Sequence, residues 1–277
     1  MRAVLLMLLT VIASAPAVAQ RRLPLPAVPD SLRTPAARAD YILLHFYDAM
    51  AWDDTAAVRD RALAEQSFAD FASVIPHAGK DALRGAASAL SEAYMRDSVA
   101  CAMFAALCMQ YLFERESPVR NLDACEVFLG EQLRLGYPDT TRARVMLDLM
   151  ALNRPGTAAP DFEYTGRDGA VHRLSEHFGR EFVLMFYDPD CAGCAAAMAR
   201  LRDIDMPVVA IYSGAKRDVW ERRAVVPGGW TDGIASEAVL GDDELYFAPA
   251  LPTLYLIAPD GSVELRDASP DELLRVR

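Results

Sequence analysis

The chain has 277 residues, of which 53% are hydrophobic and 24% are charged, and its formal net charge is −11. This balance is typical of a globular protein that is long enough for two compact domains, and it excludes a disordered chain. The acidic charge, with no run of Lys or Arg, argues against binding to nucleic acid or to an anionic membrane surface, because both need a positive protein surface.

The first segment, MRAVLLMLLTVIASAPAVAQ, has the pattern of a secretory signal peptide. Arg2 precedes an apolar run over residues 3–13, and Ala17 and Ala19 form the small-residue pattern that signal peptidase reads. The run is shorter than the roughly 20 residues of a membrane-spanning helix, which disfavours the alternative of a membrane anchor. We therefore expect a signal peptide over residues 1–19, a linker over 20–34, a mature chain with no membrane span, and a periplasmic location.

Residues 35–153 carry apolar side chains at helical spacing with little Gly or Pro, and they predict an all-helical domain. One stripe in ADYILLHFYDAM holds Ile42, Leu43, Phe46, Tyr47 and Met50. The segment DSVACAMFAALCMQYLF is apolar nearly all round, as expected of a central helix in a bundle.

Three cysteines lie in this helical region. If Cys101 and Cys108 share a helix, their Cα atoms are about 10 Å apart, beyond the disulfide reach of about 7 Å. Cys125 could bridge to either of them. Our first expectation is nevertheless three buried thiols, because an unpaired cysteine packs as a small apolar residue.

The composition changes at NRPGTAAPDF, which predicts a linker over residues 154–160 and a second domain over 161–277. DFEYTGRDGAVHRL predicts a hairpin that turns at Asp168 and Gly169. EFVLMFY and MPVVAIYS predict two buried strands, and TLYLIAPDGSVELRD predicts a third strand that turns into a fourth. Helical segments after each of the first two runs complete the pattern of a small α/β domain.

Cys191 and Cys194 stand in FYDPDCAGCAAAM, between a predicted buried strand and a segment of strong helix formers. A thiol at a helix start faces unpaired N–H groups and the positive end of the helix dipole, which stabilise the thiolate. Cys194, three residues later, is close enough to attack a mixed disulfide on Cys191. The pair therefore suits redox chemistry, although the spacing alone is also compatible with a structural disulfide or half of a metal site.

The region from about residue 160 resembles the thioredoxin-like superfamily, in its periplasmic TlpA/ResA-type branch. The resemblance rests on APDF with a following hairpin, on C-A-G-C after FVLMFYDPD, and on ALPTLYLI about sixty residues later. It implies a thioredoxin-like fold, a cis Leu251–Pro252 bond facing the cysteine pair, and binding of the substrate chain by the backbone of Leu251. The preceding helices, with YLFERESPVRN, resemble an uncharacterised helical domain found in bacterial envelope proteins of this kind.

The sequence departs from the family pattern in ways that bear on the redox potential. Asp190 replaces the Trp that thioredoxins place before the first cysteine, and Ala192 and Gly193 replace Gly-Pro. A carboxylate at residue 190 should oppose the thiolate by like-charge repulsion. The acids that family members use near the second cysteine are missing, which leaves Asp188 and Asp190 as candidate proton acceptors for Cys194.

We expect a secreted thiol-disulfide oxidoreductase that needs no metal or organic cofactor. A zinc site is disfavoured because no second C-x-x-C exists and His172 and His177 lie in the separate hairpin region. A permanent disulfide across so short a loop would constrain the unfolded chain little. The resemblance implies periplasmic cysteine-containing proteins and a membrane thiol reductase as partners, and the alternative is a redox-silent binding or adaptor module.

Overall fold

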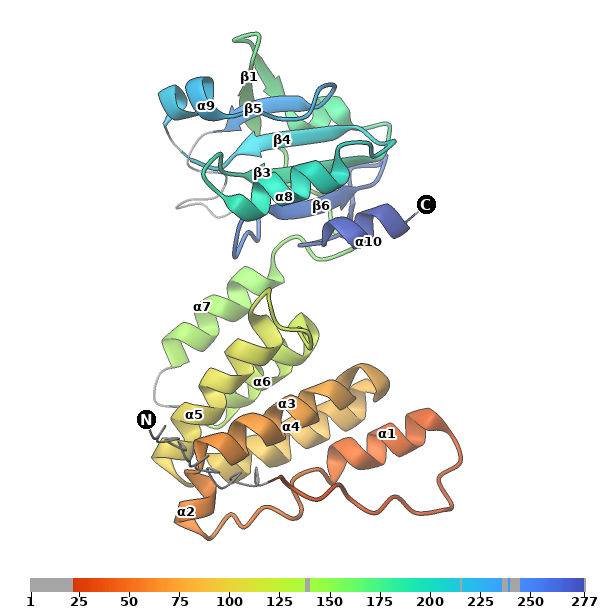
Figure 1. Cartoon of the computed structure of the whole chain (residues 1–277), viewed down its shortest axis with the longest axis vertical. Coiled ribbons are helices and arrows are strands. Elements are labelled where there is room, and N and C mark those ends of the chain that lie inside the picture. Colours follow the sequence, from red (N-terminus) through yellow and green to blue (C-terminus); the bar gives the residue numbers. More distant parts are fainter. Residues whose placement is uncertain (1–21, 138–139, 215, 236–238, 240–244, 277) are drawn as a thin grey trace, which may run out of the picture. The chain divides into compact units, whose positions relative to one another are not determined.

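The structure is a computed structural model that describes residues 22–137, 140–214, 216–235, 239 and 245–276 (Figure 1). The predicted signal peptide lies outside the described residues. The chain separates into two compact units, Met1–Phe128 and Leu129–Arg277. This division falls inside a helix that precedes the predicted linker, and the domain boundary at 154–160 stays a prediction.

The first unit is helical, as predicted. Its helices are α1 (Pro35–Leu44), α2 (Thr55–Val58), α3 (Arg61–Val74), α4 (Lys80–Tyr94), α5 (Ser98–Cys108) and the first half of α6 (Leu122–Arg134), with a short 3₁₀ turn at Ile75–His77 and a π-helical turn at Met109–Phe113. The aromatic side chains Phe68, Phe71 and Phe104 are fully buried at its centre. The helical stripe expected around residue 46 is wrong in one respect, because α1 ends at Leu44 and Phe46 is buried from the turn that follows.

The three cysteines of this unit are buried and lie outside any disulfide, as expected. Burial, reinforced by nearby Cys125, raises the pKa of the Cys108 thiol well above its usual value. Burial also raises the pKa of Cys125 to about 12. Both thiols are therefore protonated and unreactive at neutral pH.

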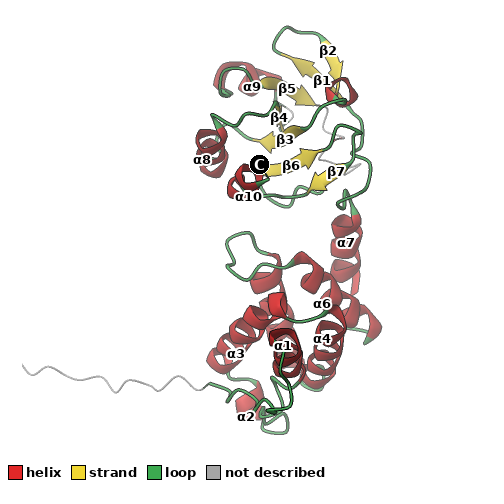
Figure 2. Ribbon diagram, turned by 90° about the vertical axis from the view of Figure 1, so that its right-hand side faces the viewer, coloured by secondary structure: helices red, strands yellow, loops and turns green. Residues whose placement is uncertain are grey.

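The second unit holds one sheet whose described strands run in the order β2-β1-β5-β4-β3-β6-β7 (Figures 1 and 2). The strands are β1 (Glu163–Gly166), β2 (Val171–Arg173), β3 (Phe182–Tyr187), β4 (Val208–Tyr212), β5 (Thr231–Ala235), β6 (Thr253–Ile257) and β7 (Val263–Leu265). The helices are α7 (Thr140–Ala151), α8 (Ala192–Leu201), α9 (Arg217–Arg223) and α10 (Pro270–Arg275), with a 3₁₀ turn at Leu174–His177. The predicted hairpin and the strands at 182, 208, 253 and 263 are confirmed, whereas β5 was not predicted.

The central strand β3 carries a core on each face of the sheet. Val183, Met185 and Tyr187 point to the side covered by α8, α9 and α10, and the alternate residues of the strand point to the other side. Every residue of β3 is buried, which explains its continuous apolar sequence. The parallel pairing of β3 with β4 places the chain after β3 at the end of the sheet, where α8 begins.

Asn153 fastens the segment before β1 to the sheet. It is 7% exposed, with a positive φ of 48° that Asn tolerates better than most residues. Its side chain donates to the carbonyl of Leu245 at 2.9 Å and accepts the N–H of Phe247 at 2.7 Å.

No helix in the described part of the chain is long and apolar enough to span a membrane.

Candidate functional site

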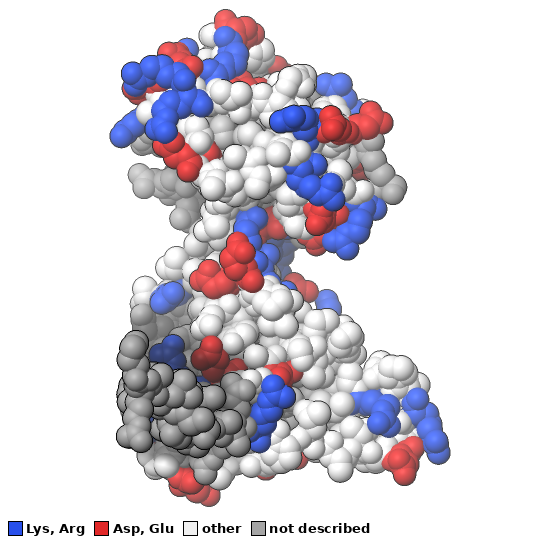
Figure 3. Space-filling model, in the orientation of Figure 1, with Lys and Arg blue, Asp and Glu red and all other residues white. Residues whose placement is uncertain are grey.

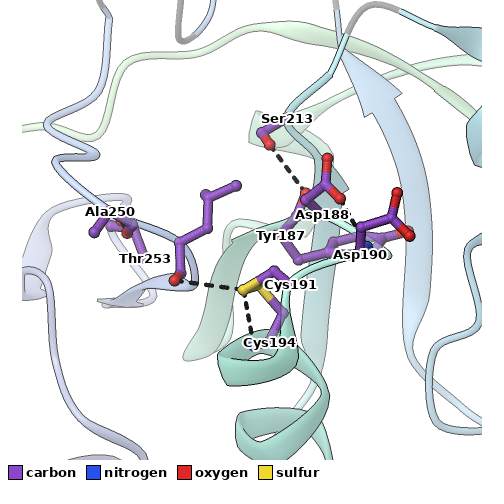
Figure 4. Close-up of a disulfide and its surroundings, with 9 residues drawn as sticks. Tyr187, Asp188, Asp190, Cys191, Cys194, Ser213, Ala250 and Thr253 are labelled. Atoms are coloured by element: carbon purple, nitrogen blue, oxygen red, sulfur yellow. Dashed lines mark hydrogen bonds between the residues drawn. A yellow bond between two sulfur atoms is a disulfide. The ribbon is translucent and has the colours of Figure 1, made fainter.

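The cysteine pair lies where β3 passes into α8 (Figure 4). β3 ends at Tyr187, and the carbonyl of this residue accepts hydrogen bonds from the N–H and the hydroxyl of Ser213 on the chain after β4. Asp188 accepts the N–H of Asp190 at 2.7 Å, which closes a tight turn. This turn delivers Cys191 to the start of the helix.

Cys191 is the N-cap residue of α8, as predicted, and forms a disulfide with Cys194 across a Cα–Cα distance of 5.2 Å. The Cys191 sulfur accepts the N–H of Cys194 at 3.0 Å. Cys191 is partly exposed, whereas Cys194 is only 1% exposed. An attacking thiol can therefore reach Cys191 but not Cys194, and the helix N–H groups face the sulfur that would carry charge after reduction.

The chain before β6 lies against this turn. The predicted cis bond between Leu251 and Pro252 is present, and Pro252 is buried. The carbonyl oxygen of Leu251 is 3.5 Å from the Cys191 sulfur. A methyl group at Gly193 would lie 3.5 Å from Pro252 Cδ and 3.8 Å from the same sulfur, so the proline ring packs on the cysteine turn.

The two candidate proton acceptors lie in different surroundings. Asp188 and Cys194 both line a cavity of about 310 Å³, whose other walls include Met198 and residues 225–227. Asp190 is absent from that lining and forms an ion pair with Arg223 of α9. Asp188 is therefore the candidate carboxylate that lines the same cavity as the buried Cys194.

Beneath the turn lies a buried polar group that the sequence did not reveal. Asp232 on β5 has a side chain only 5% exposed. It accepts hydrogen bonds from Arg167 Nε at 2.6 Å, from the Tyr187 hydroxyl at 2.7 Å and from Trp220 Nε1 at 3.1 Å. Burial, together with the bond to Asp232, raises the pKa of Tyr187 far above its usual value, so this hydroxyl stays a donor.

Arg167 extends this network to α9. Its guanidinium lies over the Trp220 ring at 4.2 Å and donates to the carbonyls of Trp220, Glu221 and Ala224. These carbonyls belong to the last turn of α9 and the residue after it, and the carbonyl of Trp220 also accepts the N–H of Ala224. The β1–β2 hairpin is thus bonded to the helix that carries Arg223.

A second cavity, of about 780 Å³, lies at the hairpin and is lined by His172 and His177, among other residues. His172 bonds Asp168 at 3.1 Å and Glu176 at 3.2 Å through opposite ring nitrogens, and His177 bonds the Tyr164 hydroxyl at 2.7 Å. Because each ring nitrogen of His172 already has a different partner, these side chains do not converge on one point. No cluster of three or more potential metal ligands occurs within the described ranges.

Comparisons with known proteins match both parts of the chain. Residues 10–147 match the family model "Domain of unknown function (DUF5106)". The chain resembles a thioredoxin-like protein from Bacteroides caccae at 24% identity, covering 92% of this chain and 99% of the other with a TM-score of 0.83. No curated protein matches.

Two shorter structures match the second half. A conserved protein of unknown function from Bacteroides fragilis is 30% identical over 44% of this chain and 98% of its own length, with a TM-score of 0.42. A putative thiol:disulfide interchange protein DsbE from Chlorobium tepidum is 26% identical over 46% of this chain and 94% of its own length, with a TM-score of 0.39. The sheet order, the cysteine turn at the start of α8 and the likeness to the Bacteroides caccae structure show that the second half of the chain has a thioredoxin-like fold.

Proposed function

We propose that this protein is a periplasmic thiol-disulfide oxidoreductase that works through Cys191 and Cys194. The observation that carries the proposal is the asymmetry of the pair: Cys191, a partly exposed residue at the helix start, is disulfide-bonded to the buried Cys194. A purely structural disulfide has no need of this asymmetry, whereas exchange needs one accessible sulfur and one protected sulfur. The TlpA/ResA-type resemblance and the secretory pattern of residues 1–19 support the location.

In the reduced protein, the Cys191 thiolate attacks one sulfur of a client disulfide. A mixed disulfide forms between Cys191 and the client, and the other client sulfur leaves as a thiolate that takes up a proton. Cys194 then loses its proton, attacks the Cys191 sulfur and releases the second client thiol. Two electrons have passed to the client, and the protein holds the disulfide between residues 191 and 194; the reverse sequence oxidises a client.

The residues around the pair have separate parts in this scheme. Leu251 offers a carbonyl beside the reacting sulfur, where the backbone of an extended client can pair with it. Pro252 packs against Gly193 on the cysteine turn, beside the reacting sulfur. Asp188 takes the Cys194 proton through the solvent of the cavity that both residues line. Ala192 is exposed beside Cys191 and leaves the approach open.

Insulin-disulfide reduction tests the proposal. Wild type should reduce insulin, Cys191→Ser should be inactive, and Cys194→Ser should accumulate mixed disulfides with periplasmic cysteine proteins. Cys108→Ser is the matched control, since it removes a buried thiol of the first unit and should retain activity. Equal activity of wild type and Cys191→Ser would favour the alternative of a redox-silent binding module, and failure to trap any client would exclude client exchange.

A further inference from the structure

The residue before the reactive cysteine poses an electrostatic problem. Asp190 is one peptide bond from Cys191, and an unpaired carboxylate there opposes the formation of a thiolate. The helix N–H groups favour the same thiolate, so two effects of opposite sign act on one sulfur. The ion pair between Asp190 and Arg223 favours the thiolate, because the positive charge of Arg223 offsets the repulsion from the carboxylate.

Arg223 comes from a part of the chain far from the cysteine turn. It is the last residue of α9, over which Arg and acidic side chains gather in Figure 3. The neighbouring Arg222 is bonded to Asp218 within the same helix and not to the cysteine turn. Arg223 therefore differs from the other Arg residues of α9, because its ion pair is with the cysteine turn and not with an acid of its own helix.

Several other ionisable groups surround this ion pair. Asp188 belongs to the same turn, and Tyr212 on β4 is affected by the charges of Asp188, Asp190, Asp218 and Arg223. Burial, followed by these carboxylates, raises the pKa of Tyr212, so it is neutral near pH 7. Arg202, the residue that follows α8, lines the same cavity as Arg223 and Cys194.

We propose that Arg223 is a positioning residue for the redox pair, acting through Asp190. This inference rests on the proposed function. Arg223 neutralises the carboxylate beside Cys191 and holds the turn against α9, so the helix start dominates and the reduced Cys191 is reactive at neutral pH. The network of Arg167 on the last turn of α9 fixes the backbone from which Arg223 reaches the turn.

The experiment measures alkylation of Cys191 in the reduced full-length protein with iodoacetamide, in a Cys194→Ser background. At pH 7 we expect Arg223→Gln to slow alkylation about two- to fivefold, the range of an exposed ion pair. Asp190→Asn should not slow alkylation. The double variant, which removes both charges, should alkylate at a rate within about twofold of the parent rate, a difference on the scale of an exposed ion pair. Arg223→Lys should restore most of the rate, because it keeps the charge.

Arg222→Gln is the matched control, with the same charge change on the adjacent residue, and it should alkylate like the parent. The alkylation rates of all variants should converge at about pH 10 to 11, where the thiol is deprotonated without help. The effect of Arg223→Gln should shrink in about 1 M salt, where charges are screened within about 3 Å. A parental rate for Arg223→Gln at pH 7, or an equal slowing by Arg222→Gln, would overturn the inference. Because alkylation needs no client, this result is separate from the outcome of the insulin assay.

Discussion

Asp232→Asn should destabilise the second unit, because the buried carboxylate binds three donors from three elements. Two of these, the Tyr187 hydroxyl and the Trp220 indole, are buried, and a hydrogen bond to a charged group contributes about 1.5–3 kcal/mol. The Arg167 side chain is 38% exposed, so its ion pair is discounted for solvent and adds about 1 kcal/mol or less. The amide still accepts one or two of these bonds, so we expect a loss of about 3 kcal/mol in the free energy of unfolding.

Urea unfolding followed by tryptophan fluorescence measures this loss, since Trp220 is itself a partner of the carboxylate. Tyr187→Phe removes one donor and should cost about 1.5 kcal/mol in wild type but much less in the Asp232→Asn background. A loss below about 1 kcal/mol for Asp232→Asn, which is the scale of a solvated pair, would refute the argument that this site is a buried network. Full additivity of the two substitutions would refute the bond between them.

Two further predictions concern the segments that flank the sheet. Asn153→Ala removes three hydrogen bonds, to Leu245, Phe247 and Tyr255, and leaves the N–H of Phe247 buried without its acceptor, so unfolding in urea should show a loss of about 2–4 kcal/mol. Asn153→Asp keeps that acceptor and should lose less, and equal losses would contradict this account. In NMR titrations His172 should titrate at a higher pH than His177, because hydrogen bonds to two carboxylates raise the pKa of His172 above 6.5, while burial lowers the pKa of His177 below 6.5. The His172 contacts therefore stabilise the hairpin fully below pH 6.5 and are lost as the pH rises through the folded-state pKa, whereas the reverse order of titration would contradict the hydrogen bonds.

The elements that the sequence predicted are those whose pattern is local. β3 and β4 are continuous apolar runs because both faces of the sheet are covered, and such runs are visible without knowledge of their partners. β5 has the sequence TDGIA and was missed, because it is short and contains Asp and Gly. Its strand conformation depends on pairing with β4 on one side and β1 on the other, and β1 is far away in the chain.

The same distinction applies to the site. The cysteine turn and the chain at Pro252 could be located because each carries a short motif and the resemblance joins them. Asp232, Arg167 and Arg223 are ordinary charged residues in their local sequence, and only the folded sheet brings them to Tyr187 and Asp190. The contacts Arg223–Asp190, Asp232–Tyr187 and Arg167–Asp232 span 33 to 65 residues, so no local pattern could have paired these residues.

The burial of Cys101, Cys108 and Cys125 has a consequence for a protein that exchanges disulfides with others. In such a protein, any other accessible thiol competes with the client for the sulfur of the reactive cysteine. Such a thiol can also be oxidised by the surroundings. Thiols that are shielded from solvent take no part in that competition, and burial also keeps those of Cys108 and Cys125 protonated. Under the proposed function, the burial of these thiols would let the chain pass through many cycles of oxidation and reduction without acquiring a wrong cross-link. A substitution that loosened the helical core would then reduce the fidelity of exchange before it abolished the fold.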